Sequence, residues 1–235
     1  MLNADQHIFA IGDIHGNREA LERLLGRLPV RPQADLLVFM GDYINRGPDT
    51  CGVLDVLVKV REQYAHTVFL KGNHEHLLLE YAAYADVEML RTLRGMGIEA
   101  TLASYGASVR DLQGLAFMPQ AHRDFLHSLS LSHSCPPYLF VHADTEEAEL
   151  AALLAESGQP DPHEAVLVDK VLSSRRLVKE HEVAGSADAA PLVVFAHAPF
   201  EMPLVLPDRI CIDTGSVHGN MLTALELPAM RFYHA

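Results

Sequence analysis

Thr67-Val68-Phe69-Leu70-Lys71-Gly72-Asn73-His74-Glu75 is the stretch around which the rest of the sequence is organised. Its first half is an apolar run typical of a buried strand, and Gly72 supplies a turn signal at its end. Asn73 can offer an oxygen to a metal ion, and His74 can carry a proton at neutral pH. Taken alone, the stretch also fits a simple helix start in which Asn73 is the cap.

Two similar strand-to-loop segments upstream favour the functional interpretation. Residues 7–11 predict a strand that leads into Gly12-Asp13-Ile14-His15-Gly16, and residues 36–40 predict a strand that leads into Gly41-Asp42-Tyr43-Ile44-Asn45-Arg46-Gly47. A helical pattern follows each loop; we expect Asn17 to cap the first helix and Pro48 to open the second. Strand, loop and helix in repeated alternation predict βαβ units with parallel strands.

The rest of the chain is expected to complete one domain over residues 1–235. Residues 76–132 have a mostly helical apolar pattern, which we interpret as a helical excursion packed on the main body. Further strands are predicted at 138–141, 192–195 and 209–213, and residues 221–227 and 230–233 predict a terminal antiparallel pair. Residues 145–156 predict an acidic helix.

Composition narrows the class of protein. With 235 residues, 49% hydrophobic and 21% charged, the chain is expected to form a globular domain with a sizeable core. The formal charge of −13 argues against nonspecific binding to nucleic acid or an anionic membrane. No apolar run has the length of a bilayer span, and the N-terminus lacks signal-peptide features, so we expect a cytoplasmic protein. Cys51, Cys135 and Cys211 form no CxxC pair and no thiol-phosphatase loop.

Five predicted strands end in side chains that can bind metal. These are Asp13 and His15, Asp42, Asn73 and His74, His142, and His197. Open sheets build sites in this way, because strands fix the loops at their ends. The mixed carboxylate, amide and imidazole donors suit Mn, Fe or Zn better than Ca or Mg. With six or more ligands, one carboxylate can bridge two metals about 3.5–4 Å apart.

The three motifs resemble the signature motifs of the phosphoprotein phosphatase family of metallophosphoesterases, and His142 and His197 follow in the family's order. Residues 97–106 and Asp213-Thr214-Gly215-Ser216 further resemble its small bacterial and phage-type members, which include serine/threonine protein phosphatases and symmetrical diadenosine tetraphosphate hydrolases. The resemblance spans residues 13–219. It implies an α/β fold, a four-layer β-sandwich flanked by helices, with a dinuclear metal site at the edge of the sheets.

The resemblance also implies roles for individual residues. The first metal is assigned to Asp13, His15 and Asp42, with Asp42 as the bridge, and the second is completed by Asn73, His142 and His197. We expect two divalent ions, Mn²⁺ first, with Fe or Zn as alternatives.

The implied reaction is phosphomonoester hydrolysis, in which a metal-bridging hydroxide attacks phosphorus in line. His74 is the expected general acid for the leaving oxygen. Arg46 and a second arginine are expected to grip the phosphate oxygens; alignment with the family favours Arg175 over Arg176. No covalent phosphoenzyme is expected. The expected substrates are phosphoserine and phosphothreonine in proteins, with phosphotyrosine and small phosphoesters as additional ones.

Three positions depart from the family pattern. Asn45 stands where an aspartate usually orients the catalytic histidine, which affects the expected efficiency of acid catalysis. Ala143-Asp144 has aspartate where glycine is usual, and His218 and Asn220 replace an aromatic residue and glycine. None of these changes removes a metal ligand.

Two other functions compete with the protein phosphatase hypothesis. One is symmetrical hydrolysis of diadenosine tetraphosphate, for which no clear adenine-stacking aromatic residue lies near the motifs. The other is a metal-binding regulatory protein with impaired catalysis, which Asn45 alone favours and the intact ligand set opposes.

Overall fold

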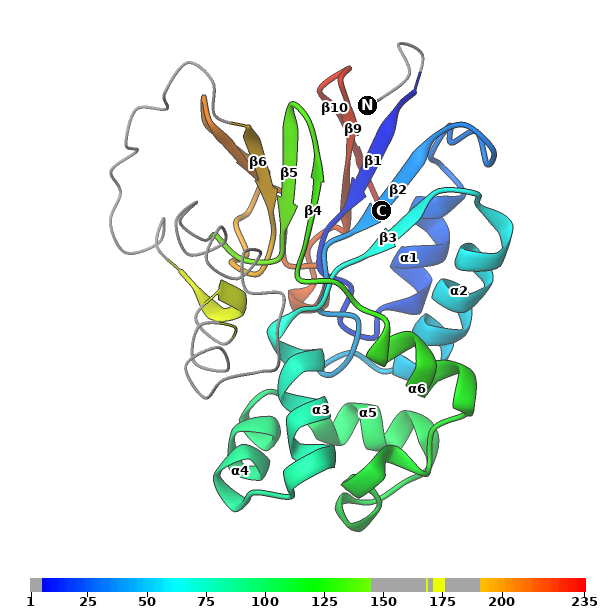
Figure 1. The fold of residues 1–235 in the computed structure, drawn as a ribbon, viewed down its shortest axis with the longest axis vertical. Coiled ribbons are helices and arrows are strands. Elements are labelled where there is room, and N and C mark those ends of the chain that lie inside the picture. The colour runs from blue at the N-terminus through cyan, green and yellow to red at the C-terminus, as the bar shows by residue number, and fades with distance from the viewer. Residues whose placement is uncertain (1–5, 145–167, 169–170, 176–190) are drawn as a thin grey trace.

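The computed structural model describes residues 6–144, 168, 171–175 and 191–235. Two five-stranded mixed sheets face each other, and helices pack against the outer face of the first sheet (Figure 1). The expected α/β sandwich is therefore confirmed. The predicted helix at 145–156 lies outside the described residues. None of the helices that the structure describes is both long and apolar enough to cross a membrane.

The first sheet has the strand order β10-β9-β1-β2-β3. Its strands are β1 (Ile8–Ile11), β2 (Leu36–Phe39), β3 (Thr67–Phe69), β9 (Thr223–Leu227) and β10 (Arg231–His234). β1, β2 and β3 pair in parallel, as the alternation of strands and helices predicts, with Ile8 opposite Leu36 and Leu37 opposite Thr67. β9 runs antiparallel to β1 and to β10, which confirms the expected terminal pair.

The second sheet has the strand order β4-β5-β6-β8-β7. Its strands are β4 (Ser132–Cys135), β5 (Tyr138–Val141), β6 (Leu192–Phe195), β7 (Leu204–Val205) and β8 (Arg209–Cys211). β5, β6 and β8 are parallel to one another, whereas β4 and β7 are antiparallel edge strands. β4 was not predicted, because its Ser-His-Ser-Cys sequence lacks the apolar character of a buried strand.

Side-chain alternation along the strands of the first sheet divides their apolar residues between two parts of the core. Ile8 and Ala10 of β1 point into the interface between the sheets, whereas Phe9 and Ile11 point toward the helices. β2 repeats this pattern, because successive residues of a strand face opposite sides of the sheet. Strands buried on both faces therefore read as continuous apolar runs.

The helices are α1 (Arg18–Leu25), α2 (Thr50–Gln63), α3 (Asn73–Tyr84), α4 (Val87–Gly95), α5 (Ile98–Tyr105) and α6 (Gln120–His127), with the short 3₁₀ helices η1 (Val109–Asp111), η2 (Gln113–Leu115) and η3 (Ser216–His218). The Asn17 side chain accepts the Ala20 N–H and caps α1, as predicted. The prediction that Pro48 opens α2 is wrong: Asp49 is the cap, and its carboxylate accepts the Gly52 N–H at 2.8 Å.

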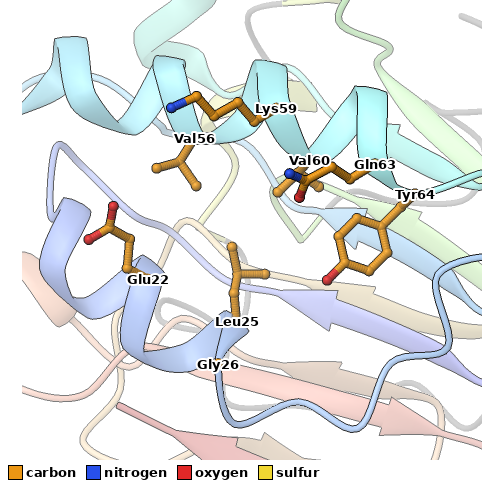
Figure 2. Close-up of a pocket in the computed structure, with 8 residues that line it drawn as sticks. All are labelled: Glu22, Leu25, Gly26, Val56, Lys59, Val60, Gln63 and Tyr64. Atoms are coloured by element: carbon orange, nitrogen blue, oxygen red, sulfur yellow. The ribbon is translucent and has the colours of Figure 1, made fainter.

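A pocket of about 350 Å³ lies between α1 and α2, near their C-terminal ends (Figure 2). Its walls include Leu25, Val56, Val60 and Tyr64. No residue that lines it belongs to the predicted site.

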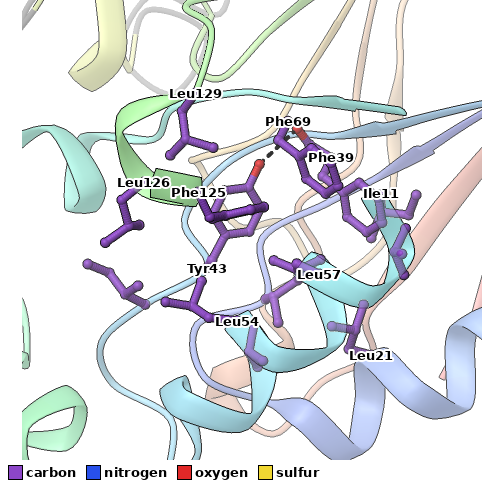
Figure 3. Close-up of a cluster of buried hydrophobic side chains, with 14 of the residues drawn as sticks. Ile11, Leu21, Phe39, Tyr43, Leu54, Leu57, Phe69, Phe125, Leu126 and Leu129 are labelled. Carbon is purple, nitrogen blue, oxygen red and sulfur yellow. Dashed lines mark hydrogen bonds between the residues drawn. The ribbon is translucent and has the colours of Figure 1, made fainter. Parts of the chain in front are cut away.

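An aromatic cluster joins the helical excursion to the first sheet (Figure 3). Phe125 of α6 is fully buried and packs edge-to-face on Phe69, with ring centroids 5.0 Å apart, and on Tyr43, with centroids 5.6 Å apart. The Tyr43 hydroxyl donates to the Leu70 carbonyl at 2.7 Å. Arg61 lies over the Phe125 ring at 4.7 Å.

We expect Phe125→Ala to lower the free energy of unfolding by about 3–5 kcal/mol, because it removes a fully buried ring and leaves a cavity. Phe125→Leu keeps most of the apolar volume and should cost roughly half as much or less. Urea denaturation of both variants measures the difference. Equal losses for the two variants would show that the ring does not anchor α6.

Candidate metal centre

The candidate site lies where the parallel strands of both sheets end. Asp13 and His15 follow β1, Asp42 follows β2, and Asn73 with His74 follows β3. His142, His197 and Asp213 follow β5, β6 and β8 of the second sheet in the same way. Because the carboxyl ends of parallel strands share one edge, segments far apart in the sequence meet there.

Asp42 is at the centre of this arrangement. Its side chain is buried, with a relative exposure of 2%. Asp42 Oδ2 is 3.5 Å from His15 Nε2 and 3.8 Å from His74 Nε2, while Asp42 Oδ1 is 3.5 Å from His142 Nε2. The carboxylate therefore faces imidazoles on two sides.

Two groups of residues in the described part of the chain have the spacing of a metal site. One consists of His15, Asp42 and His74, and the other of Asp42, His142 and His197. In each group, ligand atoms lie within 4.8 Å of one another. Asp42 belongs to both groups, which is the position that a bridging carboxylate requires.

Asn73 and one backbone carbonyl complete the second group's geometry. Asn73 Oδ1 is 3.3 Å from His142 Nε2 and 3.1 Å from His197 Nδ1. Asn73 is the first residue of α3 and Gly72 is the cap, so the simple capping role considered for Asn73 is wrong. His142 Nδ1 lies 2.7 Å from the Met40 carbonyl, which places the ring hydrogen on Nδ1 and leaves Nε2 free as a ligand.

Asp13 fits a ligand position for a different reason. It is 4% exposed, and its Oδ1 has no hydrogen-bond partner. A buried carboxylate oxygen without a partner is costly unless a cation binds it. His15 is oriented like His142, since its Nδ1 lies 3.0 Å from the Ile44 carbonyl and its Nε2 points to Asp42. The donor set therefore fits two divalent cations.

The electrostatics of the site also indicate that positive charge is needed. Burial raises the pKa of Asp42 to about 7, against the opposing effects of the His74 backbone N–H and Arg46. Burial and the neighbouring Asp213 raise the pKa of Asp13 well above its usual value. Burial lowers the pKa of His15 to about 3. Without a cation, burial therefore disfavours the charged forms of both the carboxyl groups and the imidazoles. A divalent cation nearby makes the ionised carboxylates favourable again.

Glu75 is an essential part of the geometry whose role sequence reasoning missed. It is fully buried, and its oxygens accept the backbone N–H groups of Asp42 at 2.9 Å, Tyr43 at 2.8 Å, Ile44 at 3.2 Å and Gly72 at 3.0 Å. Its position at the third residue of α3, after the Gly72 cap, predicts only the bond to the Gly72 N–H; the three donors of the second motif are distant in the sequence, and no local signal predicts them. Glu75 thereby fixes the second motif to the third.

Backbone strain is concentrated in the same loops. Of the eight non-glycine residues with positive φ among those described, five are His15, Asp42, Asn45, Arg46 and His197. Such conformations are uncommon outside glycine and persist where surrounding contacts impose them. Gly72 allows a close approach, because a Cβ there would lie 2.1 Å from Asp42 Oδ1.

Two arginines reach the site from its rim. Arg46 is exposed, and its Nη1 is 3.1 Å from His15 Nε2. Arg175 is also exposed, and its Nε is 3.5 Å from His197 Nε2. Both guanidinium groups are placed beside candidate metal ligands. Arg176, the alternative to Arg175, lies outside the described residues.

The departures from the family pattern have local partners. Asn45 Nδ2 lies 2.9 Å from His74 Nδ1, so Asn45 is in the place expected of an orienting residue. Asp144 is buried and accepts from Arg209 Nη1 at 2.5 Å. Asn220 is exposed and donates to the Glu201 carbonyl at 3.0 Å.

Comparison with known proteins finds related sequences and a similar fold. The family model described as calcineurin-like phosphoesterase matches residues 6–220. Serine/threonine-protein phosphatase 2 of Escherichia coli K12 is 30% identical over 230 residues, covering 94% of this chain and 93% of the relative. The asymmetrical bis(5'-nucleosyl)-tetraphosphatase PrpE of Geobacillus thermodenitrificans is 27% identical, and the match covers 95% of this chain and 91% of the relative. The structure of a cold-active protein tyrosine phosphatase superposes with a TM-score of 0.63, over 100% of this chain and 78% of the phosphatase chain. The two sequences are 16% identical, so the likeness concerns the fold.

We expect Asp42→Asn to lower the metal content from about two ions per chain to one or fewer, since a neutral amide is a poor bridge between two cations. Turnover should be lost with the metal. Elemental analysis and a phosphatase assay measure the two effects. The exposed Asp124→Asn exchange makes the same chemical change on α6 and should alter neither. Two bound metals and near-normal turnover in Asp42→Asn would contradict the shared-ligand assignment.

Proposed function

Because the chain belongs to the calcineurin-like phosphoesterase family, we propose that it is a metal-dependent phosphomonoester hydrolase that acts on phosphoserine and phosphothreonine in proteins. The observation that carries the proposal is Asp42, which belongs to both buried groups of potential ligands. In the first group we assign His74 to the substrate, and the partnerless Asp13 takes its place as a ligand. The 30% identity to serine/threonine-protein phosphatase 2 over nearly the whole chain supports the substrate class.

Six residues are proposed to hold the two metals: Asp13, His15, Asp42, Asn73, His142 and His197. The mixed nitrogen and oxygen donors favour Mn²⁺, with Fe and Zn as alternatives. When bound, such cations supply Lewis-acid polarisation of phosphoryl oxygens and lower the pKa of water.

The chain's own side chains are proposed to bind and orient the phosphate. Arg46 and Arg175 approach from the open side of the site, where guanidinium forks can hold two phosphate oxygens and offset charge on phosphorus. His74 is buried, with 1% exposure, and its Nε2 points to the Asp42 side of the site. From there it is proposed to place a hydrogen at the leaving oxygen.

Hydrolysis of dinucleoside tetraphosphates is the second candidate. It is favoured by the PrpE relative, whose name specifies the asymmetrical reaction rather than the symmetrical one expected from the sequence. The same ligand and arginine arrangement can serve a phosphoanhydride, because both reactions place a phosphoryl group beside the metals. The products distinguish the two modes: asymmetrical cleavage gives ATP and AMP, and symmetrical cleavage gives two molecules of ADP.

The deciding experiment compares kcat/KM for a phosphoserine peptide and for diadenosine tetraphosphate, with the full chain in the same Mn²⁺ buffer. We expect the peptide to be preferred, and Asp42→Asn to abolish activity toward both. A preference for the dinucleotide would favour the second candidate. If the wild-type chain binds metal but hydrolyses neither substrate nor p-nitrophenyl phosphate, a regulatory metal-binding role replaces both.

We expect Arg46→Ala and Arg175→Ala each to lower kcat/KM roughly 10- to 100-fold, because a hydrogen bond to a charged group is worth about 1.5–3 kcal/mol. KM should rise and kcat should fall while the metal content stays unchanged. Steady-state kinetics with parallel elemental analysis measures this. A normal Arg175→Ala enzyme beside a crippled Arg176→Ala enzyme would reverse the choice between these neighbours.

A further inference from the structure

A chain of buried hydrogen bonds runs from the start of α2 to the ring of His74. Thr101, on α5, is fully buried. Its Oγ1 accepts the Asn45 backbone N–H at 2.9 Å and donates to Asn45 Oδ1 at 2.8 Å. The Thr50 hydroxyl lies 3.1 Å from the same Thr101 oxygen. At the other end, Asn45 Nδ2 lies 2.9 Å from His74 Nδ1.

The number of hydrogens that each group can donate determines which atom is the donor in every bond of this hydrogen-bond chain. The single hydroxyl hydrogen of Thr101 is used toward Asn45 Oδ1, so Thr50 must be the donor in its contact with Thr101. With its oxygen engaged, the Asn45 amide presents its NH₂ group to the histidine. His74 Nδ1 must then be the acceptor. In the neutral ring, the hydrogen therefore resides on Nε2.

The opposite direction leaves a buried hydrogen without an acceptor. If the amide turned over, Nδ2 would donate to Thr101, and Thr101 would donate to Thr50. Thr50 is also fully buried, and among the described residues its hydroxyl contacts Thr101 alone. Its own hydrogen would then have no acceptor, which buried hydroxyl groups avoid. Thr50 therefore determines which way the Asn45 amide is turned, because its hydroxyl fixes the donor role of Thr101.

We propose that Thr101 is a positioning residue that sets the tautomer of His74 through Asn45, so that His74 presents an N–H at Nε2 on the substrate side. The effect of Thr101 on catalysis rests on the proposed phosphoester hydrolysis, whereas its effect on the His74 tautomer does not. Thr101 touches no candidate metal ligand in the hydrogen bonds described above, and it lies on an excursion 56 residues away from Asn45 in the chain.

The direct test is the ¹⁵N chemical shifts of the His74 ring in the zinc-loaded protein, since Zn²⁺ is d¹⁰ and has no redox chemistry. We expect an unprotonated Nδ1 and a protonated Nε2 in the wild type. Thr101→Val keeps the shape of the side chain but removes the hydroxyl, so the amide can turn and the hydrogen should move to Nδ1. Thr101→Ser restores the hydroxyl and should return the wild-type shifts.

A control on the same helix separates this effect from a general disturbance of α5. Ser104 donates no hydrogen bond to Asn45; its Oγ accepts the Cys51 N–H at 2.8 Å. Ser104→Ala should leave the His74 shifts unchanged. A protonated Nδ1 in the wild type would overturn the proposal, as would unchanged shifts in Thr101→Val. These outcomes can be read even if Thr101→Val is unstable, because the wild type alone tests the tautomer.

Kinetics tests the catalytic consequence separately. With Nδ1 engaged as an acceptor, neutral His74 would offer the leaving oxygen a hydrogen bond from Nε2 and keep its hydrogen, because full transfer would leave an imidazolate; the leaving oxygen takes its proton from solvent. For an alkyl phosphate, whose leaving oxygen needs such a donor most, Thr101→Val should lower kcat roughly 10- to 100-fold with little change in KM, the usual scale for residues that orient a metal site. The loss for p-nitrophenyl phosphate should be smaller, and Thr101→Ser should be near wild type. Equal losses for both substrates would overturn the catalytic part. Absence of all hydrolysis in the wild type would contradict the proposed function while leaving the tautomer result intact.

Discussion

The carboxylate of Glu75 holds two of the three signature loops in one arrangement. Each of its oxygens accepts two backbone N–H groups, Oε1 from Tyr43 and Ile44 and Oε2 from Asp42 and Gly72. Burial raises the pKa of Glu75 to about 7. Yet both oxygens are already occupied as acceptors, so the ionised form is the one that the four donors fit. Hydrogen bonds to a charged group contribute about 1.5–3 kcal/mol each, which is comparable to the roughly 1–3 kcal/mol of strain at each left-handed residue of the loop.

That arrangement concentrates negative charge where little positive charge is available. Asp13, Asp42, Glu75 and Asp213 are all at most 4% exposed. The arginines of the site, Arg46 and Arg175, are exposed at its rim. Unpaired carboxylates are costly in such surroundings, and an apolar core of the same shape would be more stable. Bound cations would offset this charge, and because Asp42 belongs to both candidate ligand groups, their binding would be coupled to the conformation of its loop.

Local patterns were sufficient to predict the framework, because apolar runs and turn residues act over a few positions. β1, β2, β5 and β6 lie where the local patterns place them. Polar residues at strand ends pointed to the candidate metal ligands, whereas Asn45, Arg46 and Arg175 were expected only from the resemblance; the structure brings all ten to one edge. Contacts between distant segments were not predictable in this way. The edge strand β4 is polar and owes its structure to pairing with β5. The contact of Thr101 with Asn45 joins a helix to a loop, and no pattern of apolar residues in the sequence predicts it.

The helical excursion does more than cover the sheet, because α5 supports the motif that carries Asp42. The Arg46 N–H donates to the Gly97 carbonyl at 3.2 Å, just before α5 begins, and Thr101 binds Asn45 from the first turns of the same helix. Gly97 has φ of 85°, and a Cβ there would lie 3.2 Å from the Arg46 nitrogen, so the close approach favours glycine. Arg46 and Asn45 are thus positioned by a segment that follows them by about fifty residues. A change in the packing of α5 would act on the proposed phosphate contact of Arg46 and on the His74 ring together, while the contacts of α5 described here include no candidate metal ligand.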